Sequence, residues 1–256
     1  MAKSQHARMA HIPVLLQDCL KVLAPSSGEF FIDGTLGGGG HTLEIIERLQ
    51  PGGIFLGIDK DPGAVSNFQS VISGKYFALE RIILKSASYS DLESVLDSEG
   101  LRAADGLLLD LGFSSEQIRG GALSGRGFSF SADEPLLMTY NPQHTPLREL
   151  LTKLDEAELE KIITEYGEER YSGPIAAAVA KKASQGMINT TFDLVRAIES
   201  ATPKSYEHGR IHPATRTFQA LRIYTNNELN ELKQILEKIT KIIAIGGRVA
   251  VISFHS

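Results

Sequence analysis

The amino-acid sequence predicts an α/β protein whose doubly wound parallel sheet is interrupted by a helical insertion. Short apolar segments alternate with segments of helical periodicity over residues 29–111. This alternation stops over residues 119–148, only helical periodicity follows up to residue 200, and one more apolar segment comes near the end. A chain of 256 residues is long enough for one large α/β domain that contains an insertion.

The first half of the chain contains four short apolar segments that read as strands. They are residues 29–33, 54–59, 81–85 and 105–111. Nearly continuous apolar strands are typical of a parallel sheet that is covered on both faces. Helices are predicted between them, at residues 42–49, 64–72 and 91–96. Pro62 suits the first turn of the second helix, and Ser90 is a candidate cap for the third.

The second half of the chain is predicted to be helical before the sheet resumes. Helical spacing is found at residues 147–154, 157–166, 173–182 and 191–200. A further helix at 227–243 leads into a strand at 248–254. We therefore expect one domain made of residues 1–118 and 213–256, with a mainly helical insertion at 119–212.

The net charge of −5 argues against a protein that binds nucleic acid over its whole surface. The insertion has 11 Lys and Arg against 13 Asp and Glu, a net charge of −2. Residues 203–224 have four basic residues against Glu207, a net charge of +3 before histidines. Any RNA contact is therefore expected to be local and close to that segment.

The single cysteine, Cys19, excludes an intrachain disulfide and fits a reducing compartment. It lies among apolar residues at helical spacing, so a core position is expected. The seven histidines show no spacing typical of metal ligands, and we expect no metal site. No apolar run reaches the ~18 residues that a membrane span requires, and a cytoplasmic location is expected.

A glycine-rich turn follows the first predicted strand and is the first candidate binding site. Asp33 ends the strand, and Gly37, Gly39 and Gly40 follow it. Such a turn lets a ligand approach the backbone closely, in front of the free N–H groups of the next helix. Asp59 ends the second strand, 22 residues after Gly37, where an acid can accept hydrogen bonds from the ribose of an adenosine cofactor.

These features fit either a nicotinamide-dependent oxidoreductase or a methyltransferase. Gly37 and Gly39 match two glycines of the dinucleotide fingerprint, but Thr42 stands at the third position. Asp33 would repel a pyrophosphate, whereas it suits a cofactor with a sulfonium and an amino group. This favours S-adenosylmethionine.

Asp110 closes the fourth predicted strand and is expected at the same edge of the sheet as Asp33 and Asp59. Together with Ser114 and Ser115 it is a candidate catalytic group that accepts a proton from the group to be methylated. A role for Asp110 in positioning the cofactor is an equal alternative.

Two further segments are candidate RNA contacts. Residues 125–130 resemble the aromatic strand of an RNA-recognition motif, but no second such strand is visible. We predict a loop there, with Arg126 available to contact phosphate and Phe128 close to the substrate. In the segment 212–224, His212, Arg216 and Arg222 are the candidates.

Eight segments in order resemble the bacterial 16S ribosomal RNA cytosine-N4 methyltransferase family. They are HIPVLL (11–16), IDGTLGGGGH (32–41), GIDKDP (57–62), LLLDLGFSSEQ (107–117), GRGFSF (125–130), YGEER (166–170), HPATRTFQALRI (212–223) and GGRVAVISFHS (246–256). The resemblance implies a class I, Rossmann-like methyltransferase sheet with a substrate-recognition insertion. It implies S-adenosylmethionine as donor, and a cytosine in the decoding region of small-subunit ribosomal RNA as acceptor, within the assembled subunit. The implied cofactor contacts are Gly39, Gly40, His41, Asp59, Tyr89, Asp110 and Gln117, and His255 joins the RNA contacts.

Two departures from the family pattern leave a non-catalytic ribosome-assembly factor as an alternative. Residues 137–141 are LMTYN, where the family usually has Asp-Met-Arg-Met-Asp. Relatives also continue past Ser256, so we expect the strand at 248–254 to lie at an apolar sheet edge.

Overall fold

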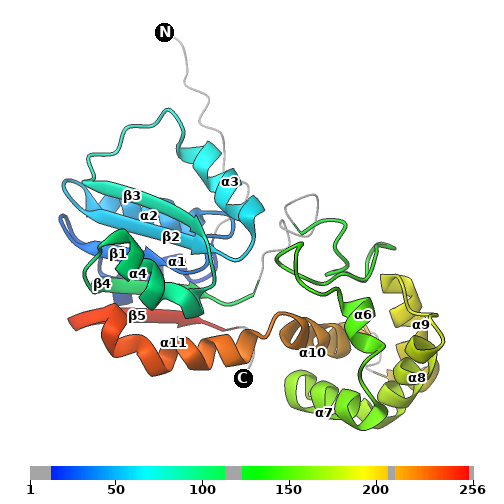
Figure 1. Cartoon of the computed structure of the whole chain (residues 1–256). Coiled ribbons are helices and arrows are strands. Elements are labelled where there is room, and N and C mark those ends of the chain that lie inside the picture. The colour runs from blue at the N-terminus through cyan, green and yellow to red at the C-terminus, as the bar shows by residue number, and fades with distance from the viewer. Residues whose placement is uncertain (1–12, 113–122, 207–210, 254–256) are drawn as a thin grey trace. The chain divides into compact units, whose positions relative to one another are not determined.

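The computed structural model describes residues 13–112, 123–206 and 211–253, which form two compact units (Figure 1). One unit comprises Met1–Gln117 and Glu231–Ser256, and the other comprises Ile118–Asn230. The helical unit thus extends past residue 212, where the sequence placed its end. The reason is that helix α10 (Thr215–Thr225) packs on helix α7 (Glu156–Gly167) of the same unit.

The described part of the first unit contains a parallel sheet in the order β3-β2-β1-β4-β5. The strands are β1 (Phe30–Asp33), β2 (Ile54–Asp59), β3 (Arg81–Ser86), β4 (Ala104–Asp110) and β5 (Ile243–Ile252). The chain starts in the middle of the sheet, winds outward through β2 and β3, and then returns to the other side of β1. This is the doubly wound topology that the alternating pattern predicts.

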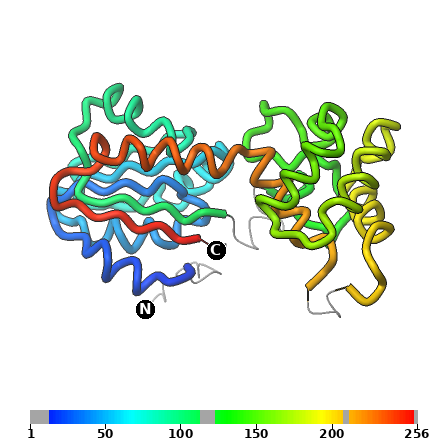
Figure 2. Tube along the Cα trace, turned by 90° about the horizontal axis from the view of Figure 1, so that it is seen from below, coloured from blue at the N-terminus to red at the C-terminus, as the bar shows by residue number. Residues whose placement is uncertain are grey.

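Helices cover both faces of this sheet. On one face lie α1 (Leu16–Leu23), α2 (Gly40–Leu49) and α3 (Pro62–Ile72), and on the other α4 (Leu92–Glu99) and α11 (Glu228–Ile242). Figure 2 shows α1 and α11 on opposite sides of the sheet. Within β1, Phe30 and Ile32 pack toward α4 and α11, whereas Phe31 packs toward α1 and α2. Because both faces are buried, the strands read as continuous apolar runs.

Side-chain caps begin helix α3 and the short turn ahead of α4. Asp61 caps α3 by accepting a hydrogen bond from the Gly63 N–H at 2.9 Å, and Pro62 follows in the first turn as expected. The predicted cap at Ser90 is wrong. Ser88 instead accepts from the Ser90 N–H and begins a short 3-10 turn, η1 (Tyr89–Asp91), ahead of α4.

The helical unit contains α6 (Leu147–Leu151), α7, α8 (Ser172–Ser184), α9 (Thr191–Ala201) and α10. Capping boxes begin α7 at Asp155 and α9 at Thr190. Gly167 ends α7 where α10 comes close, since a Cβ there would lie 2.7 Å from the Arg216 carbonyl oxygen. Over the residues that the structure describes, no helix combines the length and apolar character that crossing a membrane requires.

Candidate active site

The glycine-rich turn connects the end of β1 to α2 at the carboxyl edge of the sheet. Gly37 and Gly39 have φ angles of +47° and +75°, a region that favours glycine. A Cβ on Gly39 would lie 2.3 Å from the Phe68 ring of α3, so close packing also requires glycine there. Helix α2 begins at Gly40 without a side-chain cap, so its first N–H groups face the turn.

Asp33 holds this turn from inside. Its carboxylate accepts hydrogen bonds from the Thr42 hydroxyl at 2.6 Å and from the Thr35 N–H at 3.0 Å. The residue is buried, and burial raises the pKa of its carboxyl, although the bonds from Thr42 and Thr35 oppose this change. Thr42, which departs from the dinucleotide fingerprint, therefore has a defined role as the partner of Asp33.

Asp59 joins the end of β2 to the same turn. One carboxylate oxygen accepts from the Gly37 N–H and the other from the Asp61 N–H, both at 2.9 Å. Burial raises the pKa of Asp59 to about 6, while these two N–H bonds lower it and the nearby Asp61 and Asp33 raise it further. Asp59 is therefore more than a helix cap, because it fixes the glycine turn.

Two more strand ends complete this edge of the sheet. The Asp110 N–H donates to the Thr35 hydroxyl at 2.7 Å, which ties the end of β4 to the turn. The Asp110 carboxylate lies 3.8 Å from Nδ1 of His41 in the first turn of α2. His41 Nε2 donates to the Val14 carbonyl at 3.0 Å, so Nδ1 is the nitrogen directed at Asp110. Tyr89 approaches the turn from η1. Its Cβ is so close to Gly34 that a Cβ added to this glycine would lie only 3.2 Å away from it.

The site thus combines a glycine turn, a helix N-terminus and three acids at the ends of β1, β2 and β4. A cluster of three carboxyls disfavours a pyrophosphate and favours a ligand with cationic groups. The arrangement also places acids that can accept protons or hydroxyl hydrogen bonds at the edge where ligands of open α/β sheets bind.

Comparison with known proteins identifies the family. The model of the MraW methylase family matches residues 8–256. The chain belongs to the MraW methylase family. Among similar proteins is the ribosomal RNA small subunit methyltransferase H of Geotalea uraniireducens, 42% identical over 96% of this chain and 77% of that protein. The protein of the same name from Deinococcus radiodurans is 41% identical over 96% of this chain and 75% of its own length.

One similar solved structure covers part of the chain. A Clostridium thermocellum protein, provisionally described as an rRNA methylase, matches 38% of this chain and 50% of its own, with a TM-score of 0.33 and 19% identity. The family match and the parallel sheet confirm the predicted Rossmann-like fold class.

In this methylase, the described cofactor candidates come together at one edge of the sheet. They are Asp33, Gly37, Gly39, Gly40, His41, Asp59, Tyr89 and Asp110. Ser114, Ser115, Gln117 and His255 lie outside the described residues. The roles assigned to all of these residues stay predictions.

The RNA candidates of the helical unit have contacts within that unit. Arg126, expected to be available for phosphate, donates instead to the Tyr140 and Thr139 carbonyls, at 2.5 and 3.5 Å. Phe128 is buried and stacks on Tyr140 with ring centroids 5.2 Å apart. Arg222 pairs with Glu228 at 2.9 Å, and both side chains are largely buried. These three residues thus have partners within the unit, and their assigned RNA contacts stay predictions.

Arg216 and His212 lie at the other end of α10, where His212 is exposed and Arg216 is half-buried. Arg216 donates to the Tyr206 hydroxyl at 3.0 Å, and that hydroxyl donates to Glu169 at 2.6 Å. His212 is 38% exposed at its side chain and stacks on Phe130, with centroids 4.6 Å apart. Of the described RNA candidates, His212 alone is exposed, and the RNA roles of all of them stay predictions.

Proposed function

We propose that this chain transfers a methyl group from S-adenosylmethionine to the N4 amine of a cytosine in the decoding region of small-subunit ribosomal RNA. The family match and the names of the relatives support methylation of small-subunit RNA. The observation in the structure that supports the donor best is the glycine turn held by Asp33 and Asp59, with a third carboxyl at Asp110.

The residues at this edge fit S-adenosylmethionine rather than a dinucleotide. The backbone at Gly38 is open, since a Cβ there would meet nothing within 4 Å, so a ligand can approach the turn. We assign Asp59 to the ribose hydroxyls and Tyr89 to the adenine ring of the donor. The other two acids, Asp33 and Asp110, are assigned to its cationic half. When bound, S-adenosylmethionine supplies a methyl group on a positively charged sulfur.

The chain's own residues then have to orient the cytosine amine and remove its proton. The lone pair of this amine is delocalised into the ring, so an acceptor for its hydrogens raises its reactivity. We assign that role to the Asp110 carboxylate. S-adenosylmethionine would supply the methyl group for N4, and Asp110 would orient the amine and accept the N4 proton. His41, directed at Asp110 through Nδ1, then lies beside a carboxyl that gains and loses a proton.

We further assign substrate recognition to the helical unit, with Arg216 and His212 as contacts for the RNA, and we propose the assembled small subunit as the substrate. The negative net charge of the chain fits a partner that is recognised at a few sites rather than by general attraction to phosphate.

The cofactor assignment is tested by calorimetric titration with S-adenosylmethionine and, separately, with NAD. We expect saturable binding of the former, and loss of this binding in Asp59→Ala. Binding of NAD alone would contradict a methyltransferase. Binding of neither by the folded protein, together with retained association with ribosomal subunits, would instead support a non-catalytic assembly factor.

A further inference from the structure

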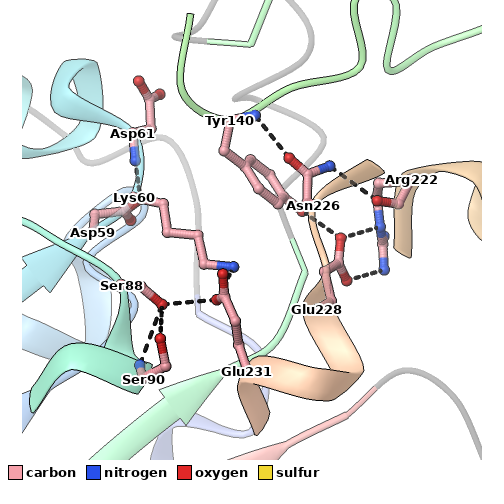
Figure 3. A network of polar contacts seen from close by, with 10 residues as sticks. All are labelled: Asp59, Lys60, Asp61, Ser88, Ser90, Tyr140, Arg222, Asn226, Glu228 and Glu231. Atoms are coloured by element: carbon pink, nitrogen blue, oxygen red, sulfur yellow. Dashed lines mark hydrogen bonds and ion pairs between the residues drawn. The ribbon is translucent and has the colours of Figure 1, made fainter. Parts of the chain in front are cut away.

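Glu231 is not one of the expected cofactor contacts, but its carboxylate links the two segments that contain Asp59 and Tyr89. Glu231, the fourth residue of α11, forms an ion pair with Lys60 and accepts a hydrogen bond from the Ser88 hydroxyl at 2.7 Å (Figure 3). The side chains of Lys60 and Glu231 are only 14% and 16% exposed. The Ser88 oxygen also accepts from the hydroxyl and the N–H of Ser90, at 2.9 and 3.2 Å.

The two partners of Glu231 are neighbours of the expected adenosine contacts. Lys60 directly follows Asp59, and Ser88 and Ser90 flank Tyr89. The Lys60 ammonium also lies over the Tyr89 ring, 5.1 Å from its centroid, at a distance typical of a cation–π contact. The ends of β2 and β3 are therefore connected through side chains as well as through the sheet.

Glu231 suits this role because its ion pair is largely buried. A charge pair with little solvent around it is screened weakly, so its geometry is held more firmly than that of a surface pair. Another ion pair of α11 is more exposed to solvent. Lys241 of α11 pairs with Glu93 of α4 at 2.6 Å, but the Lys241 side chain is 66% exposed.

We propose that Glu231 is a positioning residue for the adenosine half of the methyl donor, acting through Lys60 on Asp59 and Tyr89 and through Ser88 on Tyr89. This inference rests on the proposed function, because it assigns Asp59 and Tyr89 to the donor. It predicts that α11, which follows the helical unit in sequence, contributes to donor affinity without touching the donor.

The test measures binding of S-adenosylmethionine by calorimetry and steady-state methyl transfer for five proteins. They are the wild-type chain, Glu231→Gln, Lys60→Met, the double variant, and Glu93→Gln as the matched control. Loss of one charged hydrogen bond predicts roughly 10-fold weaker donor binding for each single variant. The double variant should lose no more than either single one, since both disrupt the same pair. The KM for the donor should rise while kcat at saturating donor stays near the wild-type value.

Lys60→Arg, which keeps the charge, should recover most of the affinity and shows that folding alone is not the cause. Thermal unfolding of every variant provides the same check. Wild-type affinity in folded Glu231→Gln would overturn the positioning role and leave the proposed function intact, as would losses that add in the double variant. Failure of the wild-type chain to bind S-adenosylmethionine would instead overturn the proposed function, and the positioning role with it.

Discussion

Acid should weaken binding of the donor's adenosine half, because the carboxyl assigned to the ribose becomes protonated at an unusually high pH. Burial raises the pKa of Asp59 from its ordinary value of 3.8 to about 6, despite the hydrogen bonds from the Gly37 and Asp61 N–H groups. Between these two pH values the folded protein holds a proton that the unfolded chain has released. Stability therefore falls as pH rises from 3.8 to 6, and the contribution of Asp59 is constant above that window.

The magnitude follows from the same two values. The gap between 3.8 and about 6 corresponds to about 3 kcal/mol of unfolding free energy lost by neutral pH. Only the ionised carboxylate can accept from both ribose hydroxyls while it also holds the Gly37 N–H. At pH 5 roughly one Asp59 in ten is ionised, so the dissociation constant should be about 10-fold larger than at pH 8.

Calorimetric titration with adenosine from pH 5 to pH 8 measures this effect without the charged groups of the methionine half. The wild-type chain should show affinity that rises up to about pH 6 and then levels off. Asp59→Asn should bind weakly with no such slope, whereas Asp97→Asn, which changes an exposed acid of α4, should keep the wild-type profile. Affinity independent of pH in the wild type, or the same slope in Asp59→Asn, would refute the assignment.

Three other substitutions test single features of the structure. Gly39→Ala should destabilise the chain by about 1–3 kcal/mol in urea unfolding and abolish donor binding, because the added Cβ would meet Phe68 and Gly39 has a positive φ. Gly38→Ala is the control and should keep wild-type stability, because a Cβ has space there. Thr42→Ala should cost about 1–3 kcal/mol by removing a partner of buried Asp33, and Thr42→Ser should recover most of it; equal stability of the two would contradict this role. Arg222→Met should lower the stability of the helical unit by about 3 kcal/mol and leave adenosine binding unchanged, since it removes the cation that pairs with the largely buried Glu228. A loss of RNA binding with unchanged stability would instead favour the assignment of Arg222 to the RNA.

The sequence predicts the sheet unit well because its signals are local. Apolar runs that end in Asp33, Asp59 and Asp110 mark strand ends, and the parallel topology brings strand ends to one edge. The sequence predicts Asp59 as a ligand contact, and its separation of 22 residues from Gly37 corresponds to a direct hydrogen bond in the structure.

Other features depend on partners that lie far apart in the sequence. Lys60 and Glu231 show no pattern that links them, and Thr42 reads as a mere departure from a fingerprint until Asp33 is seen beside it. Arg126 and Arg222 look like free basic residues in the sequence. It does not reveal that the Tyr140 and Thr139 carbonyls accept from Arg126 or that Glu228 pairs with Arg222. Charge predicts an RNA contact only where the fold leaves that charge available.

The most direct test of the central proposal is methyl transfer from labelled S-adenosylmethionine to small ribosomal subunits that lack the modification. The RNA is then digested to nucleosides and analysed by mass spectrometry. We expect label in N4-methylcytidine from the decoding region, and none with Asp110→Asn under the same conditions. Label at another base or atom, or undiminished transfer by Asp110→Asn, would contradict the account given for this site.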